Sequence, residues 1–164
     1  MQGNPGEQGL FQVRVQAGPF DLAVESALLS AGRTDVGAVV TFTGLCRADP
    51  AADGTALCAL VLEHYPGMAE EEISRHLDEA RQRWPLQGAI IVHRHGRITP
   101  GEPIVLVVTA SAHRAAAFEA AEFLMDWLKT NAPFWKKEER VAGAGQWVEA
   151  KDHDDTAAAR WQTR

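Results

Sequence analysis

The sequence predicts a single α+β domain in which helices pack on a mainly antiparallel β-sheet. Segments typical of strands and helices follow one another in the order βαββαβ and then βαββ. The 164 residues suffice for one domain with a sizeable core, and 46% apolar and 23% charged residues are ordinary for a folded domain. The first nine residues lack the basic start and apolar core of a secretion signal. We therefore expect a disordered leader over residues 1–9 and one domain over residues 10–164.

In the first half of the chain, short strands surround one helix and one long loop. Residues 20–31 follow a helical pattern that ends at Gly32. Residues 45–55 hold Arg, Asp, Pro, Ala and Gly without any period, which predicts a mobile loop. The strands, recognised by alternation or by β-rich composition, are expected at residues 11–16, 37–43 and 56–63.

The second helix is the clearest element of the sequence. Pro66 and Gly67 open it, and Pro85 closes it. Three consecutive glutamates at positions 70–72 suit the positive N-terminal end of the helix dipole. Its buried stripe has the spacing i, i+4, i+7 and i+11 and consists of Ile73, Leu77, Ala80 and Trp84.

The second half of the chain predicts four strands and a long helix. The helix is expected over residues 112–131, before Pro133. A turn is expected at residues 96–101, between the first two strands. The four strands are expected at residues 89–94, 104–110, 134–140 and 146–150.

Composition excludes several classes of function. Sixteen basic against 22 acidic residues give a formal charge of -6, which argues against general binding to nucleic acid or to an anionic membrane. The longest apolar run, residues 104–110, is far shorter than a membrane span of roughly 18 residues. Two cysteines provide no disulfide framework, so we expect a reducing cytoplasm.

The start of the long helix carries an unusual pair of cations. Ser111 is the expected N-cap, which places His113 and Arg114 in the first turn. Cations there oppose the helix dipole, and a bound phosphate or carboxylate would reconcile the two. In the alternative, Arg114 extends into solvent and His113 packs without a ligand.

A second basic cluster follows the long helix. It contains Lys129, Lys136 and Lys137, and the last two must point to opposite faces of a strand. A partly buried lysine beside other cations can act as nucleophile or acid–base group, although a solvated surface position is the alternative for each. Arg47 in the predicted loop is a further candidate for substrate contact.

The sequence offers no set of metal ligands. Cys46 and Cys58 flank the predicted loop without further ligands nearby, and His93 and His95 lack a neighbouring carboxylate or thiolate. We therefore expect neither a metal ion nor a bound cofactor.

Taken together, the motifs resemble the catalytic (large) subunit family of molybdopterin synthase. The resemblance extends over residues 37–161. Its motifs are Phe42-Thr-Gly44 with Arg47, the segment 62–69, Arg83-Trp-Pro85, His93-Arg94, Ser111-Ala-His-Arg114, and Leu128-Lys129 with Ala132-Pro-Phe-Trp-Lys136.

This resemblance implies a sulfurtransferase that converts cyclic pyranopterin monophosphate into molybdopterin by installing a dithiolene. It implies an α/β-hammerhead type of fold, and a heterotetramer around a central homodimer. The sulfur donor would be a small ubiquitin-like subunit with a C-terminal Gly-Gly thiocarboxylate. The catalytic residues would be Lys129 and Lys136, and the substrate-binding residues would be Leu45, Cys46, Arg47, His113, Arg114, Lys129, Lys136, Lys137, Glu138 and Lys151.

Three positions depart from the family pattern. Leu45 and Ala48 stand where the family often has a polar or basic residue and an asparagine, and Lys151 replaces an arginine. A lysine cannot offer the bidentate fork of a guanidinium. Residue patterns alone would also fit a noncatalytic module that senses a phosphorylated metabolite.

The length of the long helix predicts a site shared between two copies of the chain. Arg114 and Lys129 lie on one stripe of the helix but are separated by roughly 22 Å at ~1.5 Å per residue. A monophosphorylated pterin is too short to span that distance. An antiparallel contact between two such helices would bring Arg114 of one copy near Lys129 of the other.

Overall fold

The computed structural model describes residues 9–141, 143–148 and 152–162. The expected leader over residues 1–9, apart from Gly9, and Lys151 lie outside these ranges. Within these ranges, eight strands form two four-stranded sheets. Sheet A has the order β1 (Phe11–Gln16), β4 (Leu86–Arg94), β6 (Pro103–Ser111) and β2 (Ala38–Leu45). Sheet B has the order β5 (Gly96–Ile98), β3 (Leu57–His64), β7 (Phe134–Arg140) and β8 (Gly143–Trp147).

The expected α+β class with mainly antiparallel pairing is confirmed. In sheet A, β1 runs parallel to β4, and the other two pairings are antiparallel. All pairings of sheet B are antiparallel. The strands are divided between two sheets, because β3 and β7 pair with each other and with neither strand at the edges of sheet A.

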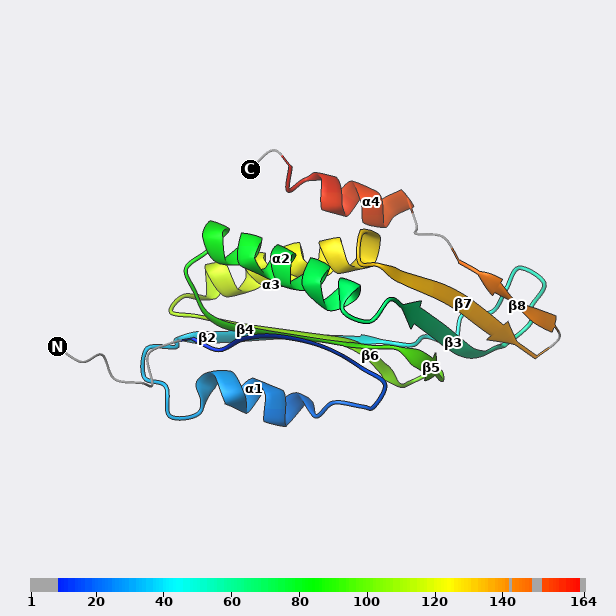
Figure 1. The fold of residues 1–164 in the computed structure, drawn as a ribbon, viewed down its shortest axis with the longest axis horizontal. Coiled ribbons are helices and arrows are strands. Elements are labelled where there is room, and N and C mark those ends of the chain that lie inside the picture. The colour runs from blue at the N-terminus through cyan, green and yellow to red at the C-terminus, as the bar shows by residue number, and fades with distance from the viewer. Residues whose placement is uncertain (1–8, 142, 149–151, 163–164) are drawn as a thin grey trace.

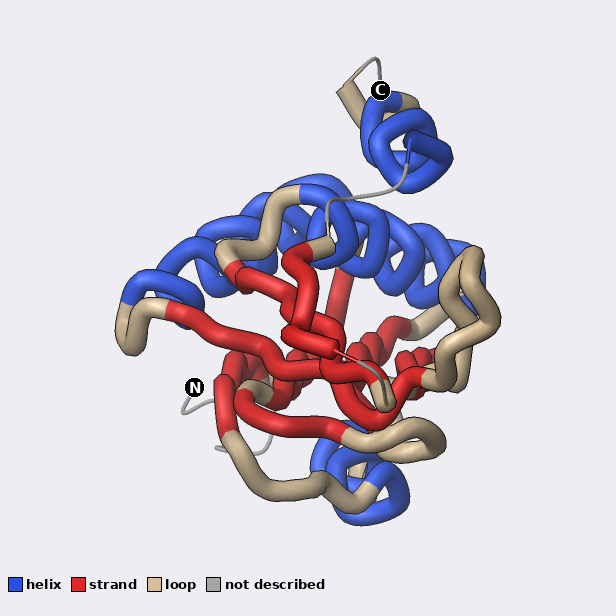
Figure 2. The backbone as a smooth tube through the Cα atoms, turned by 90° about the vertical axis from the view of Figure 1, so that its right-hand side faces the viewer, coloured by secondary structure: helices blue, strands red, loops and turns tan. Residues whose placement is uncertain are grey.

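The helices cover both faces of sheet A. The helices α2 (Met68–Arg83) and α3 (Arg114–Thr130) lie on one face, and α1 (Leu22–Ser30) lies on the other (Figure 1). The helix α4 (Asp152–Ala159) packs on α3 and forms the outermost layer (Figure 2). Sheet B extends from one end of sheet A, beyond the C-terminal end of α3 (Figure 1). None of the helices in the described residues is long and apolar enough to cross a membrane.

Three apolar clusters hold these layers together. The largest lies between sheet A and the α2–α3 layer and includes Ile73, Leu77 and Ala80 of the predicted stripe, with Trp84 packed against it. A second cluster lies between α1 and sheet A. A third and smaller cluster joins sheet B to the end of β2 and consists of Cys46, Leu57, Leu60, Leu62 and Ile98.

Two short elements were not expected. The predicted turn at residues 96–101 contains β5, which pairs with β3 after Gly96 adopts a positive φ of 85°. The helix α4 follows β8, which begins three residues before the predicted strand at 146–150. Trp161, just after α4, is buried in the largest cluster, and its indole N–H donates to Asp126 of α3 at 2.7 Å.

The interface between α2 and α3 predicts how stability depends on pH. The imidazole of His76 lies between the rings of Phe123 and Trp127, with centroid distances of 4.3 and 4.6 Å. Burial lowers the pKa of His76 from 6.5 to about 4, although Glu79 acts in the opposite direction. The unfolded chain then binds a proton that the folded chain does not, so stability falls as the pH falls from 6.5 toward 4.

We expect His76→Phe to flatten this acid dependence while keeping the aromatic stack. One histidine contributes up to about 1.4 kcal/mol per pH unit within this window. Urea unfolding of the wild type and the variant at several pH values between 4 and 7 measures the difference. An identical slope in both proteins would show that His76 does not titrate in this way.

Candidate functional site

The predicted site residues lie at opposite ends of α3. His113 and Arg114 are exposed at its N-terminal end, and Lys129 is exposed in its last turn. Sheet B, the segment around Arg47 and the start of β7 all lie beyond the Lys129 end (Figure 1). Within one chain, the structure therefore does not bring Arg114 and Lys129 together.

The N-cap of α3 differs from the prediction. The helix begins at Arg114 with His113 as N-cap, and the His113 side chain accepts no capping hydrogen bond from the helix amides. Ser111 is instead the last residue of β6, where its hydroxyl donates to the carbonyl of Pro85 at 3.0 Å. The predicted juxtaposition of cations and a helix N-terminus is present, because the first turn contains Arg114 and no acidic residue.

The two neighbouring lysines of β7 occupy opposite faces of sheet B. Lys136 stands opposite Leu62 and lies near Cys46. Its positive charge acts to lower the pKa of the Cys46 thiol. Lys137 stands opposite Val61 on one side and Trp147 on the other. Glu138 and Arg140 share the face of Lys136, since strand residues alternate between the two faces. Leu60 and Leu62 of the small cluster around Cys46 stand opposite Glu138 and Lys136 on this face.

Cys46 is an anchor of the chain and not an accessible thiol. Its side chain is buried, and burial raises the pKa of the thiol. Its amide donates to the carbonyl of Glu102 at 2.9 Å, and its carbonyl accepts from Gly101 at 2.7 Å. The start of the segment that carries Arg47 is therefore held in a fixed position.

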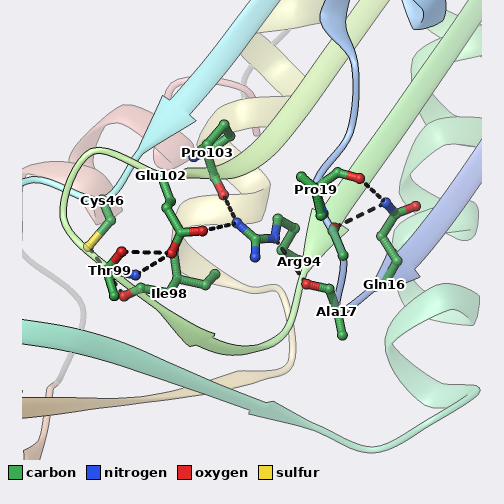
Figure 3. A network of polar contacts seen from close by, with 10 residues as sticks. Gln16, Ala17, Pro19, Cys46, Arg94, Ile98, Thr99, Glu102 and Pro103 are labelled. Atoms are coloured by element: carbon green, nitrogen blue, oxygen red, sulfur yellow. Dashed lines mark hydrogen bonds and ion pairs between the residues drawn. The ribbon is translucent and has the colours of Figure 1, made fainter.

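The buried arginine Arg94 lies next to this anchor and faces Glu102, to which Cys46 is hydrogen-bonded. Figure 3 shows the Arg94 guanidinium between the carbonyls of Ala17 and Pro103, to which it donates at 3.1 and 2.9 Å. It also faces the carboxylate of Glu102 at 3.6 Å. That carboxylate accepts from both the amide and the hydroxyl of Thr99, so the turn before β6 is fixed at several points.

Arg47 itself extends into solvent. Its side chain is 76% exposed and forms an ion pair with Asp49, with Nε to Oδ1 at 2.6 Å. The neighbouring residues Leu45 and Ala48 are exposed as well, whereas Cys46 between Leu45 and Arg47 is buried. An exposed guanidinium beside an exposed leucine can contact a ligand that approaches from outside.

Three histidines and Phe134 lie together at the junction of the two sheets, where His93 and His64 contact Phe134 and His95 contacts His64. The ring of His93 stacks on Phe134 at 3.9 Å, and its Nδ1 lies 2.8 Å from the carbonyl of Arg94. Burial lowers the pKa of His93 to about 4, so its ring is neutral. The rings of His64 and His95 lie 4.5 Å apart beside it. Among the described side chains, no group of three or more His, Cys, Asp or Glu could hold a metal ion.

One residue of this region has no counterpart among the predicted ones. Arg140, at the end of β7, donates to the carbonyls of Asp49 and Thr55 and to the carboxylate of Glu138. The signal in the sequence was weak, because an arginine two residues after a glutamate on a strand is usually an exposed pair.

Comparison with known proteins gives a consistent result. The family described as "MoaE protein" matches residues 15–131. The "Molybdopterin synthase catalytic subunit" of Mesorhizobium japonicum is 63% identical over 92% of this chain and 93% of its own length. The protein with the same description in Rhizobium meliloti is 59% identical over 93% of this chain and 96% of its own. The solved structure "Molybdopterin biosynthesis MoaE protein" from Burkholderia ambifaria superimposes with a TM-score of 0.77 at 43% identity, covering 94% of this chain and all of that one.

Proposed function

This chain belongs to the MoaE protein family, and from that membership we propose that it is the catalytic subunit of a molybdopterin synthase. As a sulfurtransferase, it converts cyclic pyranopterin monophosphate into molybdopterin. The observation that carries this proposal is the 63% identity, over 92% of the chain, to a protein of that description. The sulfur donor is a small ubiquitin-like subunit with a C-terminal Gly-Gly thiocarboxylate. Because a dithiolene contains two sulfur atoms, two thiocarboxylates are consumed for each product.

The basic residues divide between binding and chemistry. Arg47, His113 and Arg114 are suited to hold the phosphate and the pterin, since charged donors bind oxyanions strongly. Lys129 and Lys136 belong to consecutive elements and assist attack on the thiocarboxylate carbonyl or transfer a proton. Leu45, Lys137 and Lys151 complete the set of substrate positions, and Cys46 contributes by anchoring the segment.

The surface beside α3 supports a homodimer at the centre of a heterotetramer. Part of the apolar surface of α3 is covered within the chain, since Phe123 and Trp127 pack against α2 and Phe123 against Trp161. Phe118 of α3 remains 61% exposed, and Phe42 of the adjacent strand β2 is 42% exposed. The strand β2 is also an edge of sheet A. Two copies that meet along this side would bury both aromatic residues.

Reconstitution tests the proposed activity. Purified protein is mixed with thiocarboxylated carrier subunit and cyclic pyranopterin monophosphate, and the dithiolene product is measured. We expect product only when all three are present. Binding of the pterin without product would instead support a noncatalytic ligand-sensing module. We place this reaction in the cytoplasm, in keeping with two free cysteines.

Arg47→Ala should mainly weaken binding of the pterin. The side chain extends into solvent, so the variant should fold normally. Loss of one charge-assisted contact corresponds to a KM raised about tenfold or more. Steady-state kinetics with varied pterin concentration measure this effect. If KM is unchanged, Arg47 does not hold the phosphate.

A further inference from the structure

We propose that Arg140 and Glu138 are positioning residues that hold the segment 46–56 in place and, through it, Arg47. The inference rests on the proposed function, because Arg47 is taken to bind the pterin monophosphate. It assigns Arg140 a part in that reaction. It also changes the role of Glu138 from substrate contact to support of Arg140.

The side chain of Arg140 bridges two distant points of the segment. One nitrogen, Nη1, donates to the carbonyl of Asp49 at 3.1 Å and to the carbonyl of Thr55 at 2.9 Å. The side chain of Arg140 is only 19% exposed, so water does not readily replace these bonds. The carbonyl of Asp49 is two residues from Arg47, and the carboxylate of Asp49 pairs with Arg47. Arg140 thus holds the residue that contacts Arg47.

Glu138 fixes the other side of the same guanidinium. Its Oε2 accepts from Nε of Arg140 at 2.9 Å and from Nη2 at 2.5 Å. These bonds orient the planar group so that Nη1 faces the segment. A lysine could not replace this arrangement, because an ammonium lacks the fixed fork of donors. A free carboxylate beside a phosphate would be repulsive, whereas a carboxylate paired with Arg140 is largely neutralised.

Between its two ends, the turn at residues 51–55 is closed by local hydrogen bonds. Ala51 donates to Thr55 and Gly54 donates to Ala51, which closes a small turn within the segment. Asp53 accepts from the amide and the hydroxyl of Thr55. The Cys46 anchor holds one end, and Val141 donates to Ala56 at 3.4 Å near the other. Arg140 therefore ties both sides of this turn to sheet B.

The decisive experiment combines Arg140→Met with Arg47→Ala in a double-mutant cycle. If Arg140 acts through Arg47, Arg140→Met alone should raise KM for the pterin about fivefold to tenfold with kcat within about twofold. The double variant should then show the KM of Arg47→Ala alone, within about twofold. Independent, multiplicative effects on KM, or a loss confined to kcat, would overturn the proposal.

Hydrogen exchange gives a readout that does not depend on activity. The amides of Ala51, Gly54 and Thr55 should exchange faster in Arg140→Met than in the wild type. Glu138→Gln keeps the length of the side chain and should show a smaller change in the same amides, which covers the case in which Arg140→Met folds poorly. Unchanged exchange in both variants would refute the anchor, whereas a wild type without turnover would refute the proposed function instead.

The chain offers matched controls on the same sheet. Arg97 of β5 pairs with Glu139 of β7 at 2.8 Å, on the face opposite to Glu138. Arg97→Met and Glu139→Gln remove a more exposed ion pair, which joins β5 to β7 and not to the segment 46–56. Both controls should leave KM and the exchange of the three amides unchanged. A change as large as that of the Arg140 variant would mean that any weakening of sheet B has this effect.

Discussion

Replacing Lys129 with alanine should lower sulfur transfer by about three orders of magnitude, equivalent to ~4 kcal/mol of transition-state stabilisation. The side chain is exposed at the end of α3, so the fold should survive. The loss should appear in kcat, because the amine is proposed to act on the reacting groups. Single-turnover assays with thiocarboxylated carrier and pterin measure it, and thermal unfolding confirms an intact fold.

Two further variants separate charge from chemistry at this position. Lys129→Arg keeps the positive charge but cannot serve as an amine nucleophile, so it should remain nearly inactive. Arg75→Ala removes another exposed cation, on α2, and should retain full activity. Lys136→Ala should also be impaired. Product formation by Lys129→Ala within a few-fold of the wild type would refute the catalytic assignment.

Mixing inactive Arg114→Ala chains with inactive Lys129→Ala chains should restore activity. The two residues lie at opposite ends of a helix of 17 residues, too far apart for one pterin to contact both. In an antiparallel pair of α3 helices, each site takes Arg114 from one copy and Lys129 from the other. A mixed dimer then contains one site with both substitutions and one intact site.

The recovery has a definite upper limit. With complete and random exchange, half of the dimers are mixed, and each holds one working site of two, so activity should approach about a quarter of the wild-type value. Differently tagged chains and co-purification establish that exchange took place. Absence of recovery in exchanged dimers would show that each site belongs to a single chain.

The regular elements with strong periodicity could be predicted from the sequence. The stripe of Ile73, Leu77 and Ala80 is buried as expected, and the strand at residues 134–140 has the predicted bounds. The opposite orientation of Lys136 and Lys137 followed from strand geometry alone. These features are predictable because each depends on residues that are close together in the chain.

Features that depend on distant partners could not be predicted. The strand β5 is only three residues long and exists because β3 pairs with it. Ser111 is not the N-cap because it remains paired in β6, where its hydroxyl also donates to the carbonyl of Pro85. The bonds from Arg140 to Asp49 and Thr55 span 91 and 85 residues of sequence. No local pattern indicates which backbone carbonyls a given arginine will meet.

The strand order of sheet A also determines when the domain can fold. Its two edge strands, β1 and β2, come from the first 45 residues, whereas the strands that they pair with come later. Val13 pairs with Ile91, and Val40 pairs with Thr109. Closing such large loops costs chain entropy before any strand pairing is gained, which slows the folding of proteins with distant contacts. During synthesis, β1 and β2 therefore cannot pair with β4 and β6 until most of the chain has left the ribosome.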